Sequence, residues 1–280
     1  MRYYKNRNRE KPVFSNINLQ GPCNYKCYFC LGNDLCLSNK INYLTTHFNK
    51  WKNFDSFLAL CRKDNIDKLY LTGQNTDPLL YFYLDELIDY LKKEGFKVGI
   101  RTNGFLSLEK MAVINSINSS ISLSIHSLSP NIHKKITGVN TIAYWDKIIN
   151  KIKVPLRVSI VVNRYNENEI FDIIKFLSNY DNVRYIQLRC VCTDTRYNTL
   201  KDDMASFDRI ENTIDKRFPI VREFYTSKIY NIYGMEVSIW KTVQTTINSY
   251  NYFTEGIISD DYFVIEGYNK YKIWVYKVNK

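Results

Sequence analysis

Three closely spaced cysteines, Cys23, Cys27 and Cys30, are the residues in this sequence best suited to chemistry. Three residues separate the first pair and two separate the second, so one short loop could surround a metal centre from three sides. Thiolates are soft ligands that select zinc, copper(I) or iron–sulfur clusters. A structural zinc site needs four ligands, and Cys36 is the nearby candidate for the fourth. Three thiolates on a cubane cluster would instead leave one iron open to a substrate or cofactor.

The loop resembles the cluster loop of the radical S-adenosylmethionine (SAM) enzymes in its spacing and in the aromatic Phe29 before the third cysteine. The resemblance begins at a predicted first strand, Val13 to Gln20, and extends to about Val191. It implies that the cysteines hold a [4Fe-4S] cluster whose fourth iron chelates the amino and carboxylate groups of SAM. One electron then cleaves SAM to methionine and a 5′-deoxyadenosyl radical, which takes a hydrogen atom from the substrate. A zinc site or three unrelated thiols remain the alternative.

The composition limits the class of protein. A chain of 280 residues with 45% hydrophobic residues can form one large domain, or one domain with an extension. No apolar run approaches the roughly 18 residues of a membrane span, so we expect no membrane segment. The basic stretch from Met1 to Lys11 precedes no apolar segment and does not resemble a secretory signal. The seven cysteines are therefore expected to be reduced thiols in the cytoplasm.

The net charge of +11 has several explanations. It could serve a nucleic-acid partner, an anionic substrate, or the docking of an acidic electron donor such as flavodoxin or ferredoxin. The basic residues are scattered rather than run together. The abundance of Lys, Asn, Ile and Tyr typical of an AT-rich genome would also account for the charge.

Hydrophobic periodicity predicts that strand and helix alternate six times before about residue 191. Units of this length imply a parallel sheet with right-handed crossovers. The family resemblance implies an α/β fold, an open partial (βα)6 barrel with a C-terminal, mostly β extension. The predicted strands are 13–20, 68–72, 97–102, 120–128, 155–163 and 183–191, and the predicted helices are 48–63, 79–93, 106–116, 142–152 and 167–180.

Three parts are expected: a basic arm (1–12), the barrel core (13–192) and an extension (193–280). Within the extension we expect a helix over 201–217, then short strands or hairpins over 227–280 that cap the barrel. No cysteine follows Cys192, so the extension cannot hold the auxiliary cluster that some radical SAM enzymes carry there.

Ligands of open α/β sheets lie at the carboxyl ends of the strands. After the second strand, Gly73 stands where many family members have Gly-Gly-Glu-Pro, whose backbone receives the methionine amino group. Asn75 is a weaker candidate in this turn, and Asp77 could simply cap the following helix. After the third strand, Asn103 lies in a Thr-Asn-Gly turn that resembles the family's, and it could point to the cofactor or only shape the turn.

The later strands supply further candidates by the two-residue period and by resemblance. Ser124 is a candidate for the ribose or the methionine carboxylate, Ser159 and Asn163 for the ribose, and backbone near Leu188 for the adenine. Candidate substrate residues are His126, Gln187 and Arg189, with Cys190 and Cys192 as possible thiols near the substrate. Packed polar side chains and buried structural cysteines are the alternatives.

Three functions follow, in order. The first is a radical SAM enzyme acting on a small molecule or a peptide, of which the peptide is less favoured without auxiliary clusters. The second is an RNA- or protein-modifying radical SAM enzyme that uses its charge and tyrosines. The third is a non-catalytic iron–sulfur or zinc protein that senses redox state or acts as a scaffold. The polar residues at successive strand ends argue against the third.

Overall fold

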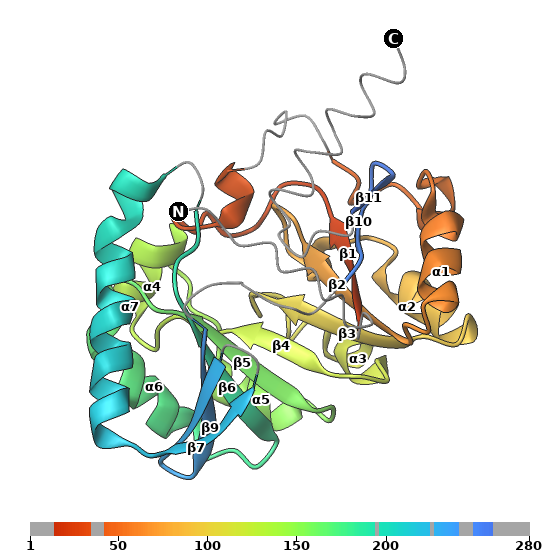
Figure 1. The fold of residues 1–280 in the computed structure, drawn as a ribbon. Coiled ribbons are helices and arrows are strands. Elements are labelled where there is room, and N and C mark those ends of the chain that lie inside the picture. The colour runs from red at the N-terminus through yellow and green to blue at the C-terminus, as the bar shows by residue number, and fades with distance from the viewer. Residues whose placement is uncertain (1–13, 35–41, 194–195, 225–226, 241–248, 260–280) are drawn as a thin grey trace.

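One sheet of eleven strands organises the part of the chain that the computed structural model describes, residues 14–34, 42–193, 196–224, 227–240 and 249–259. Six neighbouring strands run parallel, in chain order, and form its middle (Figure 1). The two edge strands of the sheet do not pair with each other, so the barrel is open, as predicted. The six are β1 (Ser15–Leu19), β2 (Lys68–Gly73), β3 (Lys97–Thr102), β4 (Ile121–Ser124), β5 (Leu156–Val161) and β6 (Val183–Arg189).

Helices connect these strands and cover the sheet, with α1 and α2 at one end and α6 and α7 at the other (Figure 1). In α2, the buried residues Leu84, Leu87, Ile88 and Leu91 follow the spacing of one helical face. Acidic residues in its first turn and lysines in its last complement the helix dipole. The helices are α1 (Phe54–Lys63), α2 (Leu84–Lys93), α3 (Met111–Ser116), α4 (Pro130–Thr137), α5 (Trp145–Lys151), α6 (Ile170–Leu177) and α7 (Tyr197–Arg217).

Several predicted elements are shorter than the sequence pattern indicated. The predicted helix 48–63 is divided into a 3₁₀ turn (Phe48–Lys50) and α1, because Asn53 adopts a left-handed conformation with φ of 57°. The predicted helix 79–93 is likewise a 3₁₀ turn (Pro78–Leu80) followed by α2. The predicted strand 120–128 ends at Ser124, and α7 begins four residues before the predicted helix 201–217.

The described part of the extension continues the sheet at both edges. Strand β9 (Met235–Trp240) pairs parallel with β6, and β8 (Ser227–Ile232) and β7 (Ile220–Phe224) follow it antiparallel. At the opposite edge, β10 (Asn251–Phe253) pairs parallel with β1, and β11 (Ile257–Ser259) pairs antiparallel with β10. These strands widen the sheet rather than covering its mouth. The basic arm, Cys36 and the last 21 residues (260–280) lie outside the described residues, and the three-part division stays a prediction.

Among the described residues, no helix combines the length and apolar character that a membrane crossing requires.

Candidate functional site

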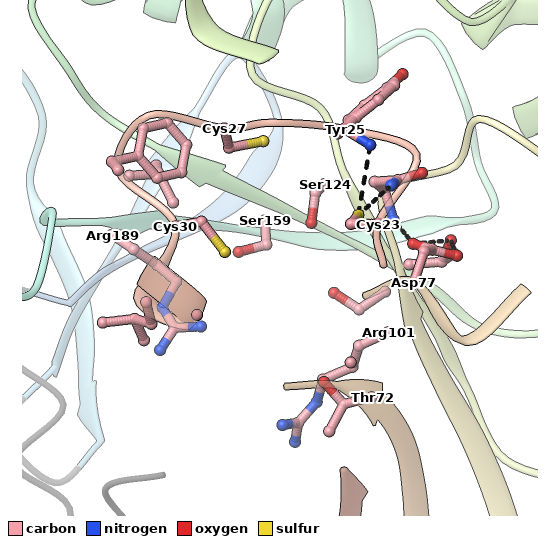
Figure 2. A pocket seen from close by; sticks show the side chains of 18 of the residues that line it. Cys23, Tyr25, Cys27, Cys30, Thr72, Asp77, Arg101, Ser124, Ser159 and Arg189 are labelled. Atoms are coloured by element: carbon pink, nitrogen blue, oxygen red, sulfur yellow. Dashed lines mark hydrogen bonds between the residues drawn. The ribbon is translucent and has the colours of Figure 1, made fainter. Parts of the chain in front are cut away.

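The three cysteines line a cavity of about 360 Å³ at the carboxyl ends of the parallel strands. Figure 2 shows Cys23, Cys27 and Cys30 on the loop along one side of this space, with the hydroxyls of Ser124 and Ser159 beside them. The loop follows β1, and the two serines are paired neighbours on β4 and β5. The sequence prediction that these residues meet at one edge of the sheet therefore agrees with the geometry.

Helix α4 supports the cysteine-containing loop through its backbone. The amide of Lys26 donates to the carbonyl oxygen of Thr137 (2.7 Å), and that of Tyr28 donates to the carbonyl oxygen of Ile136 (3.2 Å). These bonds tie the middle of the loop to the end of α4. The loop between the cysteines is thus held by another element and does not depend on a metal for its path.

An arginine and a buried aspartate hold the loop from the segment that precedes α7. The Arg196 guanidinium donates to the carbonyl oxygens of Tyr28 (2.6 Å) and Cys30 (2.8 Å) and pairs with Asp34, whose side chain is fully buried. Thr193 also donates to Asp34 (2.7 Å). Breaking a buried pair leaves an uncompensated charge, at a cost of about 3–5 kcal/mol. Sequence reasoning missed this contact, because 162 residues separate its two partners.

A second contact joins the loop to α7. The Tyr28 hydroxyl donates to Asp203 (2.6 Å), and the Arg164 guanidinium donates to both carboxylate oxygens of Asp203 (3.0 and 2.7 Å). Burial alone would raise the pKa of Asp203, but the hydrogen bonds from Arg164 and Tyr28 hold it below its usual value. Helix α7 therefore helps to position the cysteine-containing loop.

Burial raises the pKa of all three thiols. The pKa of Cys23 rises to about 11, and those of Cys27 and Cys30 are also raised. Without a metal the three side chains are therefore neutral thiols near pH 7. A metal centre must displace their protons, and binding it releases protons to the solvent.

The donor set fits an iron–sulfur cluster. Among the described residues, no three His, Cys, Asp or Glu side chains converge as the ligands of a single ion would. A cubane offers separate irons to separate thiolates, so it needs no such convergence. The loop also approaches the β2 turn closely, since a Cβ on Gly32 would lie 2.9 Å from the carbonyl oxygen of Gln74.

The turn after β2 has the features of a cradle for a small polar group. A Cβ on Gly73 would lie 1.7 Å from the carbonyl oxygen of Thr76, so only glycine fits there. The Gln74 side chain next to it lines the cavity and is buried, and neither its Nε2 nor its Oε1 has a partner among the described residues. Buried polar groups are rarely left unsatisfied. Gln74, which sequence reasoning missed, is therefore suited to a bound cofactor.

Two other residues of this turn support the cysteine-containing loop. Asn75 Oδ1 accepts from the amide of Gly21 (3.2 Å), and the Thr76 hydroxyl donates to the carbonyl oxygen of Pro22 (2.7 Å). Asn75 does not line the cavity. The contacts couple the position of the β2 turn to that of the loop.

Asp77 joins the ends of β2 and β3. Its buried carboxylate accepts from the Leu79 amide (3.0 Å), the Thr102 hydroxyl (2.8 Å) and the Asn103 amide (2.6 Å). The capping alternative for Asp77 is thus confirmed, here at a 3₁₀ turn. Burial raises the pKa of Asp77, although these hydrogen bonds oppose the shift. The Asn103 side chain lines the cavity and donates to Asn24 on the loop (2.8 Å).

His126 lines the cavity as a packed, neutral ring. Its Nδ1 accepts from the Val161 amide (3.2 Å), and its ring meets that of Phe29 edge-on at 5.2 Å. Burial, with a smaller effect from His133, lowers the pKa of His126 to about 4. Phe29 also lines the cavity, as predicted for a residue next to the cofactor.

The remaining candidates divide between the cavity and its surroundings. Arg189, Cys190 and Cys192 line the cavity, whereas Gln187 and Leu188 are buried away from it. Asn163 is buried in a turn just after β5, where its Oδ1 accepts from the Tyr165 amide (3.0 Å) and its Nδ2 donates to the Val161 carbonyl oxygen (2.9 Å). These bonds give Asn163 a role in shaping the turn.

Comparisons with known proteins agree with this geometry. The model of the family described as the radical SAM superfamily matches residues 17–177. A probable GTP 3′,8-cyclase of Saccharolobus islandicus (strain L.S.2.15 / Lassen #1) is 29% identical over 245 residues, which cover 80% of this chain and 73% of the relative. The protein of the same name from Saccharolobus solfataricus (strain ATCC 35092 / DSM 1617 / JCM 11322 / P2) is 32% identical over 181 residues, 58% of this chain and 52% of the relative.

A similar fold occurs in solved structures. Streptococcus suis SuiB bound to the precursor peptide SuiA matches with a TM-score of 0.65 and 15% identity. The match covers 88% of this chain but 58% of SuiB, and the SuiB structure bound to SAM matches with a TM-score of 0.62. At this identity the likeness shows the fold alone.

Proposed function

The chain belongs to the radical SAM superfamily, and on that basis we propose that Cys23, Cys27 and Cys30 are the ligands of its [4Fe-4S] cluster. Enzymes of this family use such a cluster together with SAM, and membership decides against a non-catalytic scaffold. The cluster, when bound, supplies the electron that cleaves SAM to a 5′-deoxyadenosyl radical able to take hydrogen from a substrate. We propose that the substrate is a small molecule.

The observation that carries the proposal is the placement of three thiols on one loop facing a polar cavity. The loop is fixed by α4 and by Arg196. The loop is therefore preorganised for a group that binds between it and the strand ends. A site held on rigid elements positions a reactive carbon against one C–H bond.

The chain's own residues then have distinct roles in holding SAM. The backbone at Gly73 and the Gln74 side chain would bind the methionine end, where the turn is too tight for a Cβ and the amide needs a partner. Ser124 and Ser159, paired on neighbouring strands, would bind the ribose or the carboxylate. Phe29 and His126 pack beside the cavity and exclude water from it.

A small substrate suits the described cavity better than a macromolecule does. Its volume of about 360 Å³ must accommodate the cofactor as well. The curated relatives carry the name GTP 3′,8-cyclase, so a purine nucleotide is the first substrate to test. The sequence has no cysteine after Cys192, so residues 193–280 would bind such a substrate without a second cluster.

An exposed basic surface beside the loop supports an acidic electron donor such as flavodoxin or ferredoxin. Lys26 on the loop and Lys134 and Lys135 on α4 are exposed, and the loop is bonded to the end of α4. Such a surface attracts an acidic partner over a distance set by ionic strength.

The test is anaerobic reconstitution with iron and sulfide, followed by dithionite and SAM. We expect 5′-deoxyadenosine and methionine in equal amounts, and a faster release when the true substrate is added, with GTP tested first. Omitting dithionite serves as the control and should stop the release. A reconstituted protein that contains the cluster but releases no deoxyadenosine under any reductant would contradict the proposal.

A further inference from the structure

Two arginines that sequence reasoning did not single out line the cavity on different strands. Arg101 is on β3 and Arg157 is on β5. Figure 2 shows Arg101 beside Thr72, across the open space from the cysteine-containing loop. The cavity therefore has a basic end that is separate from its thiol end.

The sheet register places both arginines in one row across neighbouring strands. Arg101 is paired with Ser122, Ser122 with Arg157, and Arg157 with Tyr185. The serines proposed for SAM lie two residues farther toward the carboxyl ends of β4 and β5, which corresponds to about 7 Å along a strand. The arginine row is thus deeper in the barrel than the row nearest the cysteines.

The printed partners of Arg157 are neutral. Its Nε donates to the Ser122 hydroxyl (3.1 Å) and its Nη1 to the Tyr185 hydroxyl (3.5 Å), and it lies over the Tyr185 ring at 5.9 Å. These contacts orient the guanidinium without cancelling its charge. Charged groups held in this way inside a low-dielectric cavity act strongly on a ligand.

Arg101 is oriented by aromatic rings. Its guanidinium lies 4.7 Å from the centre of the Tyr70 ring and 5.3 Å from that of Phe14. Burial would raise the pKa of the Tyr70 hydroxyl, yet it lies below its usual value, because Ser120 and the charges of Arg101 and Arg157 favour the phenolate. Both arginines therefore create a positive potential at the same place.

Acidic groups do little to offset this charge. Of the described residues that line the cavity, the one acidic side chain is Asp77, and its oxygens accept from the two strand ends that it joins. The cavity lining is thus strongly basic, which calls for an anionic ligand.

We propose that Arg101 and Arg157 bind the phosphate group of a phosphorylated small-molecule substrate at the end of the cavity remote from the cluster. The inference rests on the proposed function, since it takes the cysteine end of the cavity as the site of the cluster and SAM. Guanidinium groups match phosphate oxygens in geometry, and two of them suit a dianion better than a single carboxylate. Holding the phosphate there orients the rest of the substrate toward the carbon radical.

The test measures binding of inorganic phosphate and pyrophosphate to the reconstituted, SAM-saturated enzyme by calorimetry. Because SAM occupies its own site, any phosphate binding detected lies outside that site. We expect Arg101→Gln and Arg157→Gln each to weaken binding by about tenfold or more, in line with one charge-assisted hydrogen-bonded contact. Arg157→Lys, which keeps the charge, should weaken it less. Arg184→Gln is the matched control, because Arg184 is exposed and neighbours Tyr185 on the same strand; it should bind phosphate as the wild type does.

Three results would overturn the inference: no saturable phosphate or pyrophosphate binding by the wild type, unchanged affinity in both glutamine variants, or binding of malonate as tight as that of phosphate. If Arg157→Gln fails to fold, Arg101→Gln and Arg157→Lys still decide the question. Release of deoxyadenosine by the same wild-type preparation tests the proposed function separately. A preparation that cleaves SAM but fails the phosphate test contradicts the phosphate site alone.

Discussion

Replacing Cys27 with alanine is expected to abolish the cluster while leaving the protein folded. Cys27 would supply one of three thiolates, and two thiolates cannot hold a cubane at three corners. Its side chain packs against the small group of buried residues around Phe29 and Ile136. Removing one sulfur from this group should cost only about 1 kcal/mol of folding free energy. Iron content and visible absorbance after reconstitution should fall close to background, and deoxyadenosine release should fall with them.

The matched control is Cys61→Ala. Cys61 is fully buried in α1 and does not line the cavity. Its replacement should cost a similar or slightly larger folding free energy but leave iron content and deoxyadenosine release at wild-type levels. Full cluster content in Cys27→Ala, or equal losses in both variants, would show that the loop is not the cluster site.

The second large effect is expected for Gly73→Ala. The new Cβ would lie 1.7 Å from the carbonyl oxygen of Thr76 and 2.5 Å from its carbon, so the backbone of the turn must move. Asn75 and Thr76 bond the cysteine-containing loop, so the movement extends to that loop. We expect SAM to bind at least about tenfold more weakly, which corresponds to about 1.4 kcal/mol. The free energy of unfolding should fall by about 2–4 kcal/mol.

Gly95→Ala separates this local effect from a general loss of stability. Gly95 has φ of 88°, and a Cβ there meets nothing within 4 Å. Its replacement should cost about 1 kcal/mol through backbone strain and leave SAM affinity unchanged. SAM affinity can be measured by equilibrium dialysis on the reconstituted proteins. Wild-type SAM affinity in Gly73→Ala would contradict the cradle assigned to the β2 turn.

The alternation of strands and helices and the cysteine spacing were sufficient to predict the open barrel and the family. Hydrophobic periodicity is a local signal, and the six parallel strands each carry it. The helix boundaries were less predictable, because a single left-handed residue such as Asn53 can interrupt an otherwise helical pattern. The edge pairings could not be predicted, since β10 joins β1 across 235 residues of sequence.

The candidate site was predictable where strand alternation governs it. Ser122, Ser124 and His126 share a face by the two-residue period, and all three line the cavity. Asn163 continues the same pattern on β5 but lies beyond the end of that strand, where a turn rather than the pleat sets its direction. The pair of Arg196 with Asp34 depends on folding alone and has no signature in the spacing.

The most direct measurement of the proposed site is the electron paramagnetic resonance spectrum of the reduced, reconstituted enzyme with and without SAM. If three thiolates hold three irons and the fourth is open, SAM binding should change the spectrum of the wild type and of Cys61→Ala. Cys27→Ala should give no cluster signal. A wild-type protein that binds zinc instead of a cluster, or a cluster whose spectrum is the same with and without SAM, would contradict the proposed site.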